Sequence, residues 1–483
     1  MNKVMLMYPP GKLYQRSEDR AQCNIEYSSA GSIHACNDLG YCAAILRQSG
    51  YEVFLQDYEM ERSTLSNVVK DILLFGPDLL FMSTTNATIK EDLKIISYLR
   101  QFATFKVVIK GALFYDVDMA LLNKLQLTLI DCLIGGEVEF IIAPLCDVLL
   151  RGNGKLCDIA GIVYRENGKW CKTAFDCWHK NLDILPFPAR DLMHNELYVR
   201  PDTGEPMATI SVARGCPSQC IYCLTPIISG KKVRFRSVEN VFAEIEECYY
   251  KFGIKNFFFK ADTFTINEAF AIAVCDRIIR SDLHGKIAFT ANSRVKPLSM
   301  QLLKKMKQAG CFMLAVGFES GSASTLKKIK KGTTVADNLL AAKMIHQAGI
   351  PLFGFFMIGF PWETEKQMRK TIHHILQIKP DFAEISMAMP YYGTTLFKMS
   401  VKEGLLNDTD FGLGHDYFLM PNTVGTNYVS LKKMKNLRKF ALLKFYTRPL
   451  FLAKKAVDVC HKPVVLKNYV RYGVRLIKNL TIS

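Results

Sequence analysis

The first 150 residues alternate short apolar runs with stretches whose apolar residues recur at helical spacing. The apolar runs predict buried strands at 4–10, 53–57, 79–83, 106–111 and 132–136. The helical stretches between them are 39–49, 65–74 and 89–100. This alternation predicts an α/β domain over 1–150, built as a doubly wound parallel sheet.

Residues 151–207 follow a different pattern. The segment GIVYRENGKW resembles a β-hairpin with its turn at Asn167 and Gly168, and the segment LDILPFPARDL is marked by prolines. We interpret 151–207 as a connector between two larger units.

Strand–helix alternation resumes over 208–400. Strands are expected at 209–216, 256–262, 286–293, 311–320, 351–361 and 383–390, and helices at 239–252, 298–309, 335–348 and 365–377. Six such units predict a partial (β/α)6 barrel of the TIM type, or an open parallel sheet. In both folds the chemistry lies at the carboxyl ends of the strands. The polar residues at these ends are Cys216, Asp262, Asn292, Arg294, Glu319, Ser320 and Glu363.

The last part of the chain, 401–483, is strongly basic. From Leu431 onward it carries fourteen Lys and Arg against one acid, Asp458, which is +13 of the total formal charge of +17. The basic and apolar residues recur at helical spacing, and Pro449 and Pro463 divide the tail into pieces too short to cross a membrane. We therefore predict a basic helical region.

Three interpretations of this tail are open. Its helices could simply pack on the barrel and expose their charge to water. They could instead contact the inner face of an anionic membrane or an anionic, lipid-like substrate. Binding to nucleic acid needs only such charge, but the chain carries no zinc knuckle or recognition-helix motif, and we disfavour it.

Chain length and cysteine content indicate the number of domains and the cellular compartment. A chain of 483 residues should form two or three domains. Its fifteen cysteines are odd in number and scattered, and the start of the chain does not resemble a secretory signal. We expect a reducing, cytoplasmic location.

Three cysteines stand apart from the others, because Cys216, Cys220 and Cys223 form the pattern C-x3-C-x2-C with no fourth cysteine nearby. A structural zinc ion usually takes four ligands, often as two pairs. Three thiolates leave one position open, which favours an iron–sulfur cluster that must still bind another ligand. Elsewhere in the barrel region, Cys248, Cys275 and Cys311 are interpreted as small buried apolar residues.

The motif, with Tyr222 just before its last cysteine and a strand before it, resembles the radical S-adenosyl-L-methionine (SAM) superfamily. The resemblance implies that the three thiolates hold a 4Fe-4S cluster and that SAM chelates the remaining iron. It also implies SAM contacts at the later strand ends, by Asp262, Thr263, Arg294, Glu319, Ser320, Ile358 and Gly359. Taken singly, Glu319 could cap a helix, Asp262 could end a strand in a turn, and Arg294 could form a surface ion pair.

The front domain resembles the cobalamin-binding domain that precedes some of these barrels. Gly111 and Gly136 lie in loops that would approach a corrin. The chain departs from the pattern, since the D-x-H-x-x-G signature is absent and Ala112 replaces a usual glycine. His34 lies near the corresponding loop at a different spacing. A domain that has lost cobalamin and only shapes the substrate cavity is the alternative.

The resemblance therefore implies an enzyme that cleaves SAM reductively to a 5′-deoxyadenosyl radical. Cobalamin-dependent methylation of an unactivated carbon in a lipid-like or natural-product substrate is the favoured outcome. Radical cyclisation, carbon–carbon coupling or oxidation are the alternatives without cobalamin. An electron donor such as flavodoxin or ferredoxin is expected. A protein that only binds or senses through an iron–sulfur cluster is the competing class.

Overall fold

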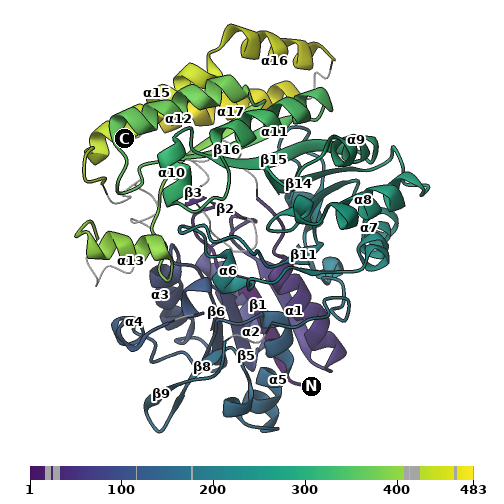
Figure 1. Cartoon of the computed structure of the whole chain (residues 1–483). Coiled ribbons are helices and arrows are strands. Elements are labelled where there is room, and N and C mark those ends of the chain that lie inside the picture. Colours follow the sequence, from purple (N-terminus) through teal and green to yellow (C-terminus); the bar gives the residue numbers. More distant parts are fainter. Residues whose placement is uncertain are drawn as a thin grey trace.

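We analysed a computed structural model of the chain, which describes residues 1–16, 23–24, 33–115, 117–175, 178–406, 413, 425–461 and 465–481. Figure 1 shows a front sheet at the bottom of the molecule, a second sheet above it, and the C-terminal helices across the top.

The front sheet is doubly wound, as the hydrophobic pattern predicts. Its strand order is β4 (Glu52–Asp57), β1 (Lys3–Tyr8), β5 (Leu79–Ser83), β6 (Lys106–Lys110) and β7 (Cys132–Ile134), all parallel. Along β1, Val4 and Leu6 pack in one apolar cluster and Met5 and Met7 in another. Helices α1 (Asn37–Gln48) and α5 (Val138–Arg151) cover the first face, and α2 (Leu65–Phe75) and α3 (Ile89–Leu99) cover the second.

The front sheet extends beyond residue 150, into the predicted connector. The expected hairpin forms, as β8 (Ile162–Glu166) and β9 (Lys169–Lys172), and β8 adds to β7 in antiparallel orientation. Its apolar residues Ile162 and Val163 are fully buried, because this edge of the sheet gives the hairpin a core to pack against. We accordingly propose a front unit that includes the hairpin, and retain the other predicted divisions as proposals.

The second sheet is a partial barrel. Its six parallel strands lie in chain order: β10 (Met207–Ser211), β13 (Asn256–Lys260), β14 (Ala288–Arg294), β15 (Cys311–Glu319), β16 (Leu352–Ile358) and β17 (Phe382–Met387). The helices that cover it are α7 (Val238–Phe252), α8 (Glu268–Ile279), α9 (Met300–Gln308), α11 (Val335–Gln347) and α12 (Glu365–Ile378). Within the described residues, β10 and β17 do not pair with each other, so the barrel stays open.

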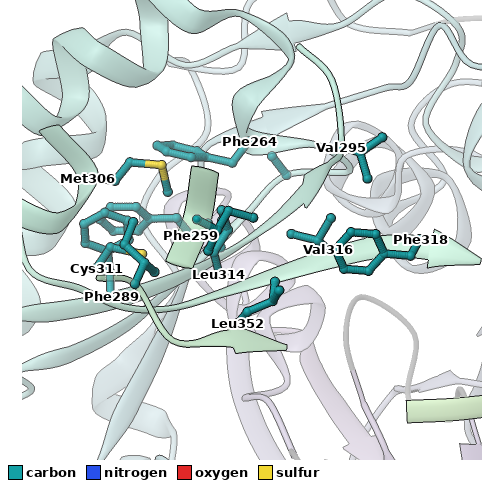
Figure 2. Packing of buried hydrophobic residues seen from close by; sticks show 14 of the residues in the cluster. Phe259, Phe264, Phe289, Val295, Met306, Cys311, Leu314, Val316, Phe318 and Leu352 are labelled. Atoms are coloured by element: carbon teal, nitrogen blue, oxygen red, sulfur yellow. The ribbon is translucent and has the colours of Figure 1, made fainter. Parts of the chain in front are cut away.

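The core between strands and helices is rich in aromatic residues (Figure 2). Phe259 and Phe289 stack with ring centroids 4.4 Å apart, and Cys311 lies in the same cluster. Cys248, Cys275 and Cys311 are at most 2% exposed, which confirms their interpretation as buried apolar residues. The pattern did not predict α5 or α8; Pro144 inside α5 interrupts the helical signal.

In the part of the basic tail that the structure describes there are three helices after residue 425, α15 (Leu431–Tyr446), α16 (Pro449–His461) and α17 (Val465–Thr481). Pro449 begins α16 as predicted, whereas Pro463 lies outside the described residues. Helix α15 packs Met434, Leu442 and Phe445 into the barrel core, so simple packing is confirmed for this helix. No helix in the described part of the chain is long and apolar enough to span a membrane.

Candidate functional site

The three clustered cysteines lie on a loop that follows β10. Strands β11 (Ala213–Arg214) and β12 (Arg234–Phe235) pair at its base and close it. At its start, Gly215 has φ +97°, and a Cβ atom there would lie 2.2 Å from the Lys232 carbonyl oxygen, so the turn requires glycine. The Gly215 N–H donates to Asp262 Oδ2 over 2.9 Å, which ties the loop to the end of β13.

A cavity of about 210 Å³ opens beside this loop, at the carboxyl ends of the barrel strands. Eight of the predicted site residues line it: Cys216, Cys220, Tyr222, Cys223, Asp262, Thr263, Arg294 and Glu319. They come from four separate strand ends. The structure therefore brings the predicted cysteines and charged residues together around one space.

The cysteine side chains are sheltered but reachable from the cavity. Cys216 and Cys220 are each 8% exposed, and Arg294 Nη1 donates to Cys220 Sγ over 3.5 Å. Burial raises the pKa of the Cys223 thiol, against hydrogen bonds from Thr225 that lower it. No three potential ligands among the described residues are gathered closely enough to hold a single metal ion. Thiolates that each bind a different iron of a cluster need not approach so closely.

A buried ion pair forms the far wall of the cavity. Lys331 Nζ donates to Glu319 Oε1 over 2.7 Å, and both side chains are less than a tenth exposed. Glu319 has φ +61° at the end of β15, an unusual backbone conformation for a residue other than glycine. Burial, and next the charge of Glu319, raises the pKa of Tyr222 well above its ordinary value.

Five predicted residues do not line this cavity. Ser320 is fully buried and its hydroxyl lies 3.0 Å from Thr371 Oγ1. Ile358 belongs to the barrel core, and Gly359, with φ +90°, donates its N–H to Glu363. Gly111 and Gly136 belong to the front unit, where a Cβ atom on either would meet atoms of the chain itself. Their glycine character is therefore explained by packing.

Two comparisons with known proteins decide the family. The protein-family model of the radical SAM superfamily matches residues 210–375 of the sequence. A protein of Pyrococcus horikoshii described as an uncharacterized methyltransferase is 30% identical over 91% of this chain and 93% of the relative. The chain belongs to the radical SAM superfamily.

More distant similarities extend beyond the radical SAM barrel. The hopanoid C-3 methylase of Methylococcus capsulatus is 24% identical over 73% of this chain and 66% of its own length. The structure of the cobalamin-dependent radical SAM enzyme OxsB, with aqua-cobalamin and SAM bound, has a TM-score of 0.72 at 16% identity, and covers 99% of this chain and 72% of OxsB. The similarity to OxsB shows that the front sheet and the barrel together have the same overall fold as that enzyme.

Another buried carboxylate of this radical SAM barrel, Glu363, was expected at a strand end but was not among the predicted SAM contacts. Glu363 is fully buried and accepts hydrogen bonds from Gly359 N–H at 2.8 Å, Phe360 N–H at 3.2 Å and the Thr325 hydroxyl at 2.9 Å. Burial raises its pKa to about 7, against these three hydrogen bonds. It holds the loop after β16 in place. The sequence signal for such a role was its position, because Glu363 lies four residues after Gly359, in the short polar segment that follows an apolar strand.

The front unit meets the barrel through charged pairs. Glu137, next to Gly136, receives two hydrogen bonds of 2.8 Å from Arg234 and lies 3.3 Å from Arg214, the residue just before the cysteine loop. Glu139 pairs with the same Arg214 over 2.5 Å. The front unit thereby fixes the base of the cysteine loop.

Where the front unit meets the barrel, Asn37 Nδ2 donates to the Thr209 carbonyl oxygen over 2.8 Å. Three buried polar atoms of this region have no hydrogen-bond partner among the described residues: His34 Nδ1, Asn37 Oδ1 and Thr209 Oγ1. His34 stacks on Phe258 with ring centroids 4.4 Å apart, and Phe258 is the register partner of Thr209. Burial, and next the charge of Lys260, lowers the pKa of His34 to about 4, so its ring is neutral. Unsatisfied buried polar atoms are costly, and this group would suit a ligand held between the two units.

Proposed function

We propose that this chain is a cobalamin-dependent radical SAM methyltransferase that acts in the cytoplasm on an unactivated carbon of a lipid-like or natural-product molecule. The observation that carries the proposal is the single cavity in which three cysteines face Asp262, Arg294 and the Glu319–Lys331 pair. A set of thiols, carboxylates and cations suits a cluster together with a zwitterionic sulfonium ligand.

In this proposal the residues that line the cavity bind either the cluster or SAM. Cys216, Cys220 and Cys223 hold the 4Fe-4S cluster. When bound, the cluster and SAM together supply a 5′-deoxyadenosyl radical. Asp262 and Thr263 receive the SAM amino group, and Arg294 and Glu319 orient the charged or ribose part of SAM.

The remaining predicted residues support this arrangement from behind. Ser320 braces the turn after Glu319 through Thr371, and Ile358 and Gly359 shape the backbone along the adenine. Ala315 and Phe355 form an apolar wall of the cavity, which helps to exclude water and suits an apolar substrate.

Cobalamin would lie between the front unit and the barrel. His34, Asn37 and Thr209 would contact it, since each has a buried polar atom without a partner among the described residues. When bound, cobalamin supplies the methyl group for transfer. The methyltransferase relative and the cobalamin-containing enzyme of similar fold support this assignment.

The test is made on anaerobically purified protein with a reconstituted cluster, supplied with hydroxocobalamin. We expect about one corrinoid per chain by mass spectrometry of the released cofactor. With SAM labelled in its methyl group and extracts of candidate lipids, label should appear in a product. Reductive SAM cleavage without corrinoid would instead favour radical cyclisation, coupling or oxidation. Neither cleavage nor corrinoid would favour a protein that only binds or senses through its cluster.

We also propose that the last helix rests on an anionic membrane surface. On α17, Leu466, Val470, Val474 and Ile477 share one face and are each at least 50% exposed. Lys467 and Arg471 flank this stripe. Exposed apolar residues beside cations are typical of helices that lie in the membrane interface.

This contact predicts selective vesicle binding. The full-length protein should sediment with phosphatidylglycerol vesicles and remain in solution with phosphatidylcholine vesicles. Val470→Asp together with Val474→Asp should weaken the binding at least about tenfold, because two charges would enter the apolar interface. Binding to neither lipid, or equal binding by the variant, would contradict the proposal; a change in oligomeric state with the variant would assign the stripe to a second copy of the chain.

A further inference from the structure

The segment after β15 lies directly against the cysteine loop. The Ile221 N–H donates to the Ile329 carbonyl oxygen over 3.2 Å, and Cys220 Sγ lies 3.9 Å from the Lys330 carbonyl oxygen. Arg294 links the cysteine loop to this segment, since it donates hydrogen bonds to both Cys220 Sγ and the Lys331 carbonyl oxygen. Residues 329–331 are thus the covering layer of the Cys220 side of the site.

This covering layer is basic on its outer surface. Residues 320–336 contain four lysines and no acid. Lys331 turns inward to Glu319. The other three, Lys327, Lys328 and Lys330, are exposed; we call them the α10 lysine patch, after helix α10 (Ala323–Lys328).

The patch is not neutralised by its surroundings. Within the described part of the chain, none of its three ammonium groups forms an ion pair with a carboxylate, and Lys328 Nζ lies over the Trp362 ring at 5.2 Å from its centroid. Cations at the end of a helix complement its dipole, which accounts for Lys327 and Lys328. Lys330 follows the helix with φ +54°, where the backbone would favour glycine, so local structure gives no reason for a lysine there.

The proposed function needs an external reductant, because cleavage of SAM at the cluster consumes one electron. Electron transfer weakens steeply with distance, so a donor protein should dock where the covering layer is thin. Low-potential carriers of the flavodoxin and ferredoxin type are acidic proteins, and a basic patch would attract and orient them.

We propose that the α10 lysine patch is the docking surface for an acidic one-electron carrier. One electron leaves the reduced flavin or iron–sulfur centre of the carrier, and the cluster on Cys216, Cys220 and Cys223 accepts it past the Ile329–Lys331 layer. No bond to either protein forms or breaks. This inference rests on the proposed cluster, and it adds the entry side of the electron and the kind of partner.

The experiment compares three proteins with reconstituted clusters. The test variant carries Lys327→Glu, Lys328→Glu and Lys330→Glu. The control variant carries the same change of charge on the outer barrel helices, as Lys304→Glu, Lys307→Glu and Lys343→Glu, all at exposed positions. Iron content and thermal unfolding establish that each protein is intact.

Reduced flavodoxin is mixed with each protein, and reduction of the cluster is followed by absorbance and electron paramagnetic resonance. The test variant should be reduced at least about tenfold more slowly than wild type at low salt. The difference should shrink at roughly 0.5 M salt, where screening weakens the attraction. The control variant should behave like wild type. Equal rates for test variant and wild type, or equal losses in both variants, would overturn the docking surface.

Sodium dithionite separates this inference from the proposed function. As a small reductant it needs no docking surface, so wild type and test variant should form 5′-deoxyadenosine at the same rate with it. If dithionite gives no 5′-deoxyadenosine with wild type, the proposed function fails, while the comparison of cluster reduction still tests docking. If the test variant alone fails with dithionite, the lysines serve the site itself and the docking proposal is wrong.

Discussion

Replacement of Cys220 by alanine is expected to lower reductive SAM cleavage below about one-thousandth of the wild-type rate, because the three thiolates act as one unit. The remaining two cysteines cannot fill the third iron site. Cys220 is also the cysteine that receives a hydrogen bond from Arg294, so its loss removes the partner of that guanidinium. Formation of 5′-deoxyadenosine with dithionite, measured beside iron content, checks the prediction.

A matched control is available in the same barrel. Cys248→Ala removes a fully buried sulfur from the apolar core behind the sheet. It should cost only about 1 kcal/mol of stability and leave SAM cleavage unchanged. Full cleavage by Cys220→Ala, or an equal loss in Cys248→Ala, would contradict the assignment of the cluster to the C-x3-C-x2-C loop.

The parts of the site that follow strand ends could be predicted from the sequence. In a parallel barrel, carboxyl ends of successive strands meet at one rim, so Asp262, Arg294 and Glu319 were expected near the cysteines. The cysteines themselves are a local motif. The sequence could not show that Lys331 would pair with Glu319, since this pairing depends on how the segment after α10 folds back over the rim.

The contacts between the front unit and the barrel could not be predicted from the sequence either. The pairing of Glu137 and Glu139 with Arg214 joins residues 75 to 77 positions apart, and neither periodicity nor spacing predicts such contacts. The hairpin at 162–172 was visible locally, but its addition to the front sheet depends on an edge strand that only the fold reveals. Helix α8 was missed because its apolar residues do not leave a clear polar face.

The fold makes a second strong prediction at Glu244, which lies on α7 and is fully buried. Its carboxylate accepts a hydrogen bond of 2.5 Å from Arg190 in the connector and another from Arg236. These arginines also donate to the carbonyl oxygens of Thr209 and Ser211 in β10. Glu244 thus joins the connector to the strand that leads into the cysteine loop.

Glu244→Ala should lower the free energy of unfolding by about 3–5 kcal/mol, because it leaves two buried guanidinium groups without their counter-charge. Burial opposes ionisation of Glu244, but Arg190 and Arg236 hold its pKa below its ordinary value. The stability that this ionisation adds is therefore present above the unfolded value of 4.5 and is lost as the pH falls toward the folded pKa. Glu244→Gln, which cannot ionise, should consequently approach wild-type stability only in acid.

Chemical denaturation followed by fluorescence, at neutral and acid pH, measures both effects. The control is Glu247→Ala on the same helix, where the carboxylate forms an exposed pair with Lys251 four residues on. Such a pair should contribute no more than about 0.5 kcal/mol. If Glu244→Ala were no more destabilising than Glu247→Ala, the buried triad would not hold β10 in place. Glu244→Ala could unfold at a lower denaturant concentration than wild type and still assemble its cluster. That result would show that the ion pairs of Arg214 and Arg234 with the front unit hold the cysteine loop instead.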